Sequence, residues 1–285
     1  MDFCSRLDNS HLSAYYVNML PIDLILVRHG QSEGNVANKT SRAGDNHFFT
    51  EEFRNRHSRT FRLTDNGIKE AKAAGIWIRE NITIPIDRFY VSDYIRAMET
   101  ASLLNIPNAE WRREFHLRER DMALQDNLPD DERQTLYPKE SQQYAQNKFL
   151  SVPAGGGESI ASLCLRLKAT MLEHWARECS DKRVIAVCHG HVMRALQVEI
   201  EDLLPERFIE LDESEKNEDK IRNCQIFWYT RRDPETNVLA PHIVAMRSVC
   251  PWDKDGDFGW RKIPRKHWNN SELLIEVEKQ KRNIS

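Results

Sequence analysis

The sequence predicts an α/β fold: a single domain built as a three-layer α/β/α sandwich around a mostly parallel central sheet, plus a cap or insert region. Runs of branched apolar residues, such as 22–27 and 184–188, alternate with longer segments of helical periodicity. Such alternation is typical of a parallel sheet covered by helices on both faces. A chain of 285 residues is also long enough to bury a large core, and the irregular polar stretch 122–157 suits a cap.

Composition and charge narrow the class of protein. A net charge of −3 gives no reason to expect a nucleic-acid or membrane partner. No apolar run approaches the ~20 residues that a membrane-spanning helix needs. Residues 1–20 lack the basic start and apolar middle of a secretory signal, and the six cysteines show no paired spacing. We therefore expect a reducing, cytoplasmic setting.

The first part of the chain predicts a lead-in, a buried strand and a loop. Residues 1–20 form a mixed polar and aromatic lead-in, in which 10–16 favour a short helix. The strand 22–27 follows, broken only by Asp23, and its continuous apolar character indicates burial. Residues 36–62 are polar and rich in arginine and histidine, which predicts a long loop. That loop is either a solvated surface insertion or a lid that gathers anions.

A helix is expected to begin after residue 64. Thr64 is a good N-cap, and Asp65 suits the positive end of the helix dipole. Its apolar face consists of Ile68, Ala71, Gly75, Ile76 and Ile78.

Strand and helix then alternate again. Residues 86–91 predict a strand, and a helix that starts near residue 92 holds Arg96 in its first turn. A short strand is expected over 111–115, before the polar stretch 122–157. A long helix opens at Glu158. Its apolar stripe at helical spacing predicts a core face made of Ile160, Leu163, Cys164, Leu167, Met171 and Trp175.

The last third predicts one more buried strand, 184–188, and a helix after it. Residues 201–222 are acidic and favour a loop, whereas 225–230 and 242–246 predict antiparallel edge strands. We expect the domain to span 21–250. Residues 251–285 then form a charged C-terminal extension with a surface helix over 271–281.

Two of the predicted strands end in the same dipeptide. His29-Gly30 follows the first, and His189-Gly190 follows the fourth. Because open α/β sheets keep their sites at the carboxyl ends of strands, the two imidazoles are expected to converge on one ligand. Arginine suits phosphate oxygens, a neutral histidine can act as a nucleophile, and a carboxylic acid can protonate a leaving oxygen. These groups indicate phosphoryl transfer without a metal or another cofactor.

The order of the motifs resembles the histidine phosphatase superfamily, the family of cofactor-dependent phosphoglycerate mutase and its acid-phosphatase-like relatives. The resemblance covers about residues 22 to 230. It is carried by six ordered blocks: Arg28-His29-Gly30 with Ser32 and Asn35; Leu63-Thr64 with Gly67 and Ala71; Ser92 with Arg96-Ala97 and Glu99-Thr100; Leu117 with Glu119; Gly157-Glu158-Ser159; and Cys188-His189-Gly190 with Arg194.

The resemblance implies a role for each residue of the site. His29 would attack phosphorus and become phosphohistidine, and Glu119 would protonate the leaving alcohol and then take a proton from water. Arg28, Arg96 and His189 would bind the phosphoryl oxygens. The phosphate pocket would be completed by Asn35, Ser32 and the backbone around Gly190.

This chain also departs from the family's pattern. Gln31 replaces a common glutamate, and His191 stands where mutases commonly carry asparagine. Residues 120–123 replace the mutases' His-Tyr-Gly, and the spacer between Asn35 and Leu63 is longer than in compact mutases. The differences favour hydrolysis of a phosphorylated small molecule or phosphoprotein over mutase activity.

Several alternatives stand beside this hypothesis. The chain could be a mutase, or a catalytically silent module that recognises phosphate. Cys188, His189 and His191 are zinc-ligand types, although no further ligands lie at a suitable spacing. Glu114 and Asp121 lie close enough in sequence to Glu119 to compete for the role of acid.

Overall fold

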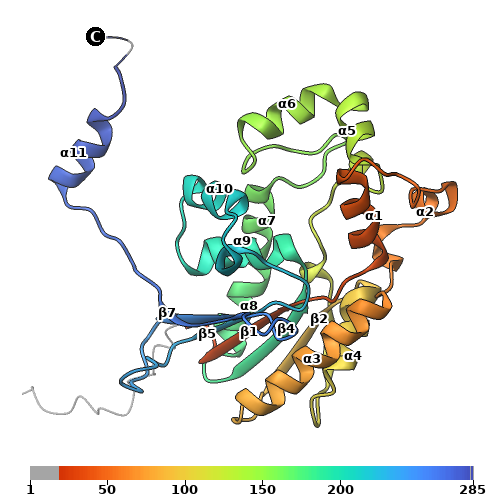
Figure 1. Cartoon of the computed structure of the whole chain (residues 1–285). Coiled ribbons are helices and arrows are strands. Elements are labelled where there is room, and N and C mark those ends of the chain that lie inside the picture. The colour runs from red at the N-terminus through yellow and green to blue at the C-terminus, as the bar shows by residue number, and fades with distance from the viewer. Residues whose placement is uncertain (1–18, 283, 285) are drawn as a thin grey trace, which may run out of the picture.

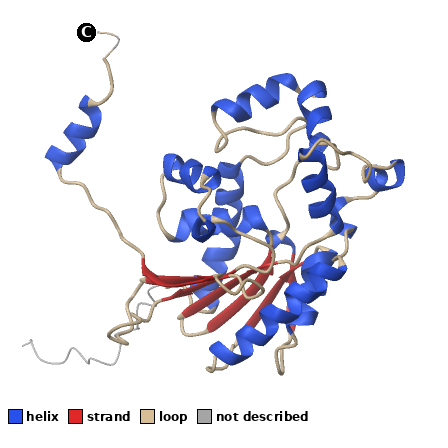
Figure 2. Cartoon of the chain, in the orientation of Figure 1, coloured by secondary structure: helices blue, strands red, loops and turns tan. Residues whose placement is uncertain are grey.

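A seven-stranded sheet forms the centre of the computed structural model, which describes residues 19–282 and 284 (Figures 1 and 2). The helix expected over 10–16 and nearly all of the lead-in lie outside these residues. The strand order is β3-β2-β4-β1-β5-β6-β7. The strands are β1 (Asp23–Arg28), β2 (Arg88–Ser92), β3 (Trp111–Glu114), β4 (Arg183–Cys188), β5 (Ile226–Thr230), β6 (Ala245–Val249) and β7 (Asp257–Lys262).

The sheet has a parallel half and an antiparallel half. β3, β2, β4 and β1 pair in parallel, whereas β5, β6 and β7 continue the sheet from β1 with antiparallel pairings. The α/β sandwich predicted from the sequence is therefore confirmed. The two strands expected at an edge are interior instead, because β7 pairs outside β6. The second of them begins at Ala245 rather than at residue 242.

Helices cover both faces of the sheet. They are α1 (Glu33–Arg42), α2 (Glu51–Asn55), α3 (Asp65–Asn81), α4 (Ile95–Leu104), α5 (Asp130–Leu136), α6 (Pro138–Gln146), α7 (Ile160–Leu167), α8 (Glu173–Glu178), α9 (Gly190–Ile200), α10 (Pro205–Glu213) and α11 (Asn270–Glu278).

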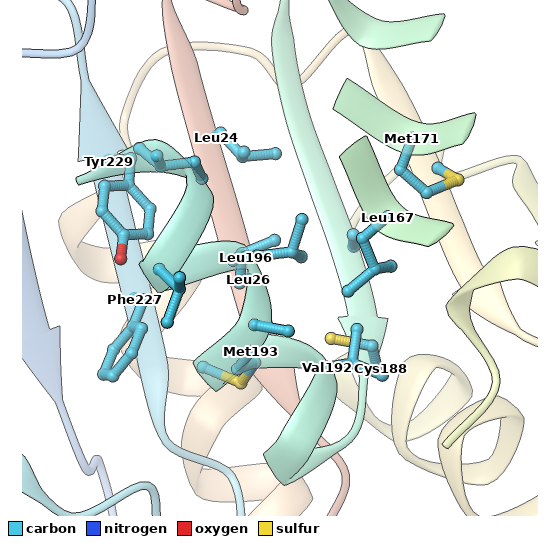
Figure 3. Packing of buried hydrophobic residues seen from close by; sticks show 14 of the residues in the cluster. Leu24, Leu26, Leu167, Met171, Cys188, Val192, Met193, Leu196, Phe227 and Tyr229 are labelled. Carbon is cyan, nitrogen blue, oxygen red and sulfur yellow. The ribbon is translucent and has the colours of Figure 1, made fainter. Parts of the chain in front are cut away.

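The core consists of two layers that share the central strands. Leu24 and Leu26 of β1 pack into the layer beneath α7 and α9 (Figure 3). Ile25 and Val27 pack into the layer beneath α3 and α4. Because successive side chains of a strand point to opposite faces, both sets must be apolar. This is why the strand reads as a continuous apolar run.

The long helix predicted after Glu158 is confirmed. α7 and α8 are joined by a π-helical turn over residues 168–172 into one helical segment. All six residues of the expected stripe are buried. In α3, Thr64 accepts a hydrogen bond from the backbone N–H of Gly67 at 3.1 Å, as a helix N-cap does. Ile76 was wrongly placed on the buried face, since 49% of it is exposed.

Three segments expected to be loops contain helices. α1 and α2 lie partly or wholly within 36–62, α5 and α6 within 122–157, and α10 within 201–222. α1 buries only Gly34, Ala37 and Ser41, and α5 and α6 bury no residue at all. Helices without a large apolar stripe leave no periodic signal in the sequence.

The chain beyond residue 250, where a charged extension was expected, continues the sheet as β7. Only α11 projects away from the body, and all of its residues are exposed (Figure 1). None of the helices within residues 19–282 has the length and apolarity that crossing a bilayer would require.

Candidate active site

The two His-Gly turns meet at the carboxyl ends of neighbouring strands. β1 and β4 pair in parallel with Arg28 opposite Cys188, so His29 and His189 leave the sheet side by side. Their ring centroids lie 5.1 Å apart, with an angle of 64° between the planes. Both side chains are almost completely buried. The register of the sheet therefore brings together two residues that are 160 positions apart in the printed sequence.

His29 is held with one ring nitrogen fixed and the other presented. Nδ1 lies 2.7 Å from the carbonyl oxygen of Gly30, and Nε2 accepts a hydrogen bond from Nε of Arg96 at 3.0 Å. This pair of contacts assigns the proton to Nδ1 and the lone pair to Nε2. Burial, together with the charges of Arg96, His189 and Arg28, lowers the pKa of His29 well below its usual value. The ring is therefore neutral, with the lone pair of Nε2 facing Arg96.

Two arginines flank this ring. Arg96, in the first turn of α4, also donates to the carbonyl oxygen of Ser58 at 2.8 Å and lies 4.8 Å from the centre of the Tyr94 ring. Arg28 donates to the carbonyl oxygen of Ile221 at 2.6 Å, and its Nε is buried without a hydrogen-bond partner in the described chain. Neither guanidinium forms an ion pair with a described carboxylate, so both remain available to an anion.

His189 mirrors this arrangement. Its Nε2 lies 2.8 Å from the hydroxyl of Ser92, at the end of β2, and its buried Nδ1 has no hydrogen-bond partner among the described residues. Burial and the charge of Arg96 lower the pKa of this histidine well below its usual value. Ser92, which the sequence reading included only as part of a motif, therefore orients the ring.

Glu119 lies close enough to His191 and His189 for their charges to act on its carboxyl group. Its Oε1 accepts a hydrogen bond from the backbone N–H of Arg120 at 2.9 Å and lies 3.5 Å from Nδ1 of His191. Burial acts to raise the pKa of Glu119. Its pKa nevertheless falls well below its usual value, because His191, His189 and a hydrogen bond from the Arg120 backbone N–H together stabilise the carboxylate more than burial destabilises it. A bound phosphate would oppose this, because a nearby negative charge favours the protonated acid.

Glu114 and Asp121, the alternatives to Glu119 for the role of acid, have different surroundings from it. Glu114 is buried at the end of β3, where it bonds His116 and pairs with Arg112, and it does not line the cavity described below. Asp121 lines the cavity, but its Oδ1 accepts a bond from the backbone N–H of Ala123. Among these three acids, Glu119 is the one in contact with a histidine at the α9 N-terminus.

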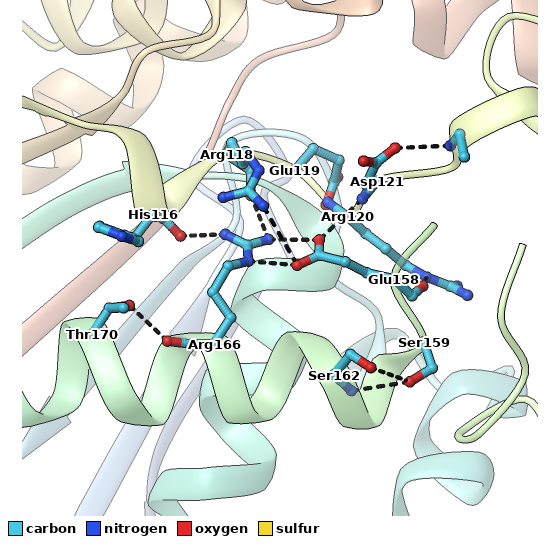
Figure 4. A network of polar contacts seen from close by, with 11 residues as sticks. His116, Arg118, Glu119, Arg120, Asp121, Glu158, Ser159, Ser162, Arg166 and Thr170 are labelled. Atoms are coloured by element: carbon cyan, nitrogen blue, oxygen red, sulfur yellow. Dashed lines mark hydrogen bonds and ion pairs between the residues drawn. The ribbon is translucent and has the colours of Figure 1, made fainter. Parts of the chain in front are cut away.

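A polar network fixes the segment that carries Glu119 (Figure 4). Arg166 of α7 donates to both carboxylate oxygens of Glu158, at 2.7 and 2.9 Å, and to the carbonyl oxygen of Arg118 at 3.2 Å. Glu158 in turn accepts a bond from the backbone N–H of Asp121, and its own carbonyl oxygen accepts one from Nε of Arg120. These bonds hold the backbone on both sides of Glu119 against α7.

Ser32 and Asn35 occupy the first turn of α1. They form a capping box in which the Ser32 hydroxyl accepts a bond from the backbone N–H of Asn35. Asn223 donates from one nitrogen to the carbonyl oxygen of His29 at 3.1 Å and to Oδ1 of Asn35 at 3.0 Å. Ser32 and Asn35 both line the cavity described below, and Ser32 fixes the start of α1 by capping it. Sequence reasoning missed Asn223 because it follows a segment without any motif.

Close backbone contacts position the first turn. A Cβ on Gly67 would lie 2.0 Å from the carbonyl oxygen of Gln31, so only glycine lets the N-terminus of α3 approach the loop after His29. Glu70 of the same helix is buried and accepts a bond from the backbone N–H of Gln31 at 2.7 Å. Glu70, which the sequence analysis did not single out, thus anchors this loop.

Gly190 begins α9, and His189 is its N-cap. The first backbone N–H groups of a helix have no partner within the helix and favour anions. A Cβ on Gly190 would lie 3.4 Å from Nε of Arg28, so the start of this helix is next to the unpaired guanidinium.

These groups open into one large cavity of about 2340 Å³. Its floor contains Arg28, His29, Arg96 and Glu119, and α1, α5, α6 and α10 contribute to its walls. Four arginines of the segment 36–62, for which a surface insertion and an anion-gathering lid were both open, are already neutralised. Arg54 pairs with Glu132, Arg56 with Glu33, Arg59 with Asp93 and Arg62 with Glu99.

The arrangement differs from a metal centre. Cys188 is fully buried in the core, and His191 contacts Glu119. Within the described part of the chain, no three histidine, cysteine, aspartate or glutamate residues are grouped as ligands. The residues brought together are instead a neutral imidazole, unpaired guanidinium groups and a carboxyl group.

Comparison with known sequences agrees with this chemistry. Residues 24–217 match the sequence model of the histidine phosphatase superfamily (branch 1). The 2,3-bisphosphoglycerate-dependent phosphoglycerate mutase of Methylobacterium sp. (strain 4-46) is 32% identical over 188 residues, which cover 64% of this chain and 82% of that protein. The enzyme of the same name from Brucella melitensis biotype 2 is 32% identical over 194 residues, covering 65% and 84%.

Solved structures with the same fold include phosphatases. Phosphoserine phosphatase of Entamoeba histolytica, in complex with 3-phosphoglyceric acid, has a TM-score of 0.56 at 19% identity and covers 78% of this chain and 93% of that one. Mycobacterial glucosyl-3-phosphoglycerate phosphatase has a TM-score of 0.56 at 19% identity and covers 87% and 98%. These likenesses show the fold alone.

Proposed function

Because the chain belongs to the histidine phosphatase superfamily, we propose that it is a phosphomonoesterase that works through a phosphohistidine on His29. The observation that carries the proposal is the state of that ring. Nδ1 is bonded to the carbonyl oxygen of Gly30, Nε2 keeps its lone pair beside Arg96, and His189 lies 5.1 Å away. A nucleophile needs this lone pair, and the cations around it suit a phosphate.

In the first step, Nε2 of His29 attacks phosphorus. The N–P bond forms as the bond between phosphorus and the leaving oxygen breaks. The leaving oxygen keeps the electron pair of the broken bond and receives a proton from Glu119. The three phosphoryl oxygens are bound by five groups: Arg28, Arg96, His189, Asn35 and the N-terminus of α9. These donors stabilise the charge that spreads over the oxygens in the transition state.

In the second step, water attacks the phosphohistidine. Glu119 takes the proton from the water, the N–P bond breaks with its electrons returning to Nε2, and inorganic phosphate leaves. The cavity of about 2340 Å³ leaves room for water to reach the intermediate, as hydrolysis requires.

The test is His29→Ala with 4-nitrophenyl phosphate as substrate. We expect activity to fall by at least a thousandfold, and trapping of radiolabelled phosphate on the protein to be lost. His242→Ala, at an exposed position outside the cavity, is the matched control and should leave activity unchanged. A His29→Ala variant that is folded and retains more than a tenth of wild-type activity would rule out the nucleophile.

A second candidate is mutase activity, which is favoured by the curated relatives named phosphoglycerate mutase at 32% identity. Isomerisation of 3-phosphoglycerate that depends on a bisphosphate primer would support it, whereas release of inorganic phosphate alone would count against it. A folded protein without activity on a broad panel of phosphate esters would instead support the silent phosphate-recognition module.

A further inference from the structure

Trp252 belongs to a part of the chain that the family model does not cover. The model matches residues 24–217, and Trp252 lies in the turn between β6 and β7. Its side chain lines the cavity, and 43% of the residue is exposed. A large exposed ring in a cavity wall loses unfavourable contact with water when a ligand covers it. The indole therefore offers the substrate a contact that the phosphoryl-transfer steps do not use.

A short segment of chain connects this indole to the phosphoryl pocket. On the side of the pocket, the carbonyl oxygen of Ile221 accepts a hydrogen bond from Arg28 at 2.6 Å. The side-chain amide of Asn223 donates to the carbonyl oxygen of His29 at 3.1 Å. On the other side, Nε1 of Trp252 donates to the backbone carbonyl oxygen of the same asparagine at 2.7 Å. The indole therefore lies one segment of chain away from the groups that bind the phosphoryl oxygens.

The ring of Trp252 is held in place on one side. Besides the bond from its N–H to Asn223, the guanidinium of Arg222 lies over one face, 5.3 Å from the ring centre. Asp253 fixes that guanidinium by accepting a hydrogen bond from its Nη1 at 2.6 Å, and backbone hydrogen bonds close the turn 250–256. Because one face is covered, the exposed area is left to the opposite face and the edge. A flat surface that is already fixed binds a ligand at little cost in conformational entropy.

The surroundings of the ring favour an aromatic ligand over an alkyl chain. Lys220, Arg222 and Asn223 are polar or charged and line the same cavity. An alkyl chain gains from burial where apolar groups enclose it, whereas an aromatic ring can stack on the indole while its electropositive edge contacts polar oxygens. We propose that the alcohol part of the substrate carries a flat aromatic ring, a nucleobase or an aryl group, which stacks on the exposed face of Trp252. This inference rests on the proposed phosphomonoesterase function and names its substrate class.

The experiment compares matched esters by the release of inorganic phosphate. Phenylalkyl and cyclohexylalkyl phosphates with two, three or four methylene groups have leaving alcohols of similar acidity, and the cyclohexyl ring is the more hydrophobic of the two. Adenosine 5′-monophosphate and ribose 5-phosphate differ by a nucleobase. We expect kcat/KM to be about three- to tenfold higher for the aromatic member of one comparison, as stacking of two aromatic rings provides. The comparison that responds identifies the ring.

Trp252→Leu and Trp252→Phe test the residue. The leucine variant should bring the ratio of the two kcat/KM values close to one, because leucine has no aromatic face. The phenylalanine variant keeps such a face and should retain most of the preference, although it lacks the indole N–H. Because the readout is a ratio, a loss of activity that is transmitted through Asn223 affects both esters and cancels. Trp268→Leu, at an exposed position outside the cavity, is the matched control and should leave the ratio unchanged.

Three results would overturn the inference while sparing the phosphomonoesterase. One is equal kcat/KM within every comparison while 4-nitrophenyl phosphate is still hydrolysed through His29. Another is a preference that Trp252→Leu retains, which would assign it to a different ring of the cavity wall, such as Phe115. The third is a preference that both variants lose, which would assign it to the indole N–H. If wild-type protein hydrolyses none of these esters, the proposed function fails and the inference falls with it.

Discussion

In the proposed mechanism, His29 must be neutral and Glu119 must change its protonation state between the two steps. The surroundings of each residue determine its pKa. Burial and nearby cations keep His29 neutral, as a nucleophile must be. The neighbours of Glu119 favour its carboxylate form, which suits the second step, in which it accepts a proton. In the first step it must be protonated, and the negative charge of a bound phosphate would raise its pKa. The negative charge of the bound phosphate would thus also favour the protonated form of Glu119.

His191→Asn tests this balance. Removing the imidazole 3.5 Å from Glu119 removes a group that lowers the pKa of the acid. Glu119 should then stay protonated to higher pH, so the alkaline limb of kcat for an alkyl phosphate should move upward by about half a pH unit. The measurement is a pH profile of kcat, which reports groups in the enzyme–substrate complex. His242→Asn is the control, and an unchanged or lowered limb in His191→Asn would contradict the assignment.

At the scale of elements, the site depends on how closely α3 approaches the loop after β1. The backbone N–H of Gln31 bonds Glu70, and Thr64 accepts from Gly67 in the same turn. Alanine at position 67 would place a methyl group against the carbonyl oxygen of Gln31, in contact with backbone that cannot rotate away.

Gly67→Ala should therefore destabilise the protein by about 1–3 kcal/mol, despite alanine's better helix propensity. It should also lower kcat by displacing the loop that follows His29. Chemical denaturation and activity on one preparation measure the two effects. Lys72→Ala, on the exposed side of the same helix, should change neither. Wild-type stability in Gly67→Ala would mean that the two backbones separate freely.

At the scale of the whole molecule, β7 completes the sheet. Arg261 donates to both carboxylate oxygens of Glu201, which also accepts a bond from the hydroxyl of the buried Tyr229. Ile263, directly after β7, belongs to the same buried core as Tyr229. By contrast, α11 is exposed along its whole length. The end of the chain is thus divided between a structural strand and an external helix.

Two C-terminal truncations distinguish the contribution of β7 from that of α11. A chain that ends after Lys266 should keep its thermal midpoint within about 2 °C and keep full activity, because the described residues that it loses, 267–282 and 284, are exposed. A chain that ends after Cys250 loses β7 and exposes the edge of β6, so it should unfold at least about 5 °C lower or aggregate. Thermal melts of both chains make the comparison, and equal midpoints would contradict the structural role of β7.

Much of the architecture could be predicted because its signal is local. The strand 22–27, the stripe from Ile160 to Trp175 and the Thr64 cap each follow from neighbouring residues. α5 and α6 could not be predicted in this way, since they bury no residue. α5 is held by polar contacts with residues far away in sequence, such as those of Asp130 with Ser41 and of Glu132 with Arg54. Asn223 and Glu70 were missed for a related reason, because each acts through a backbone group far away in sequence.

By itself, the sequence determined the α/β class and the set of groups available for chemistry, because apolar periodicity and side-chain identity are properties of short stretches. Only the tertiary structure decided which of those groups meet. The register between β1 and β4 brings the imidazoles together, and the ion pairs around the cavity leave a few guanidinium groups uncompensated. Both are set by contacts between residues far apart along the chain, which no short stretch of sequence encodes.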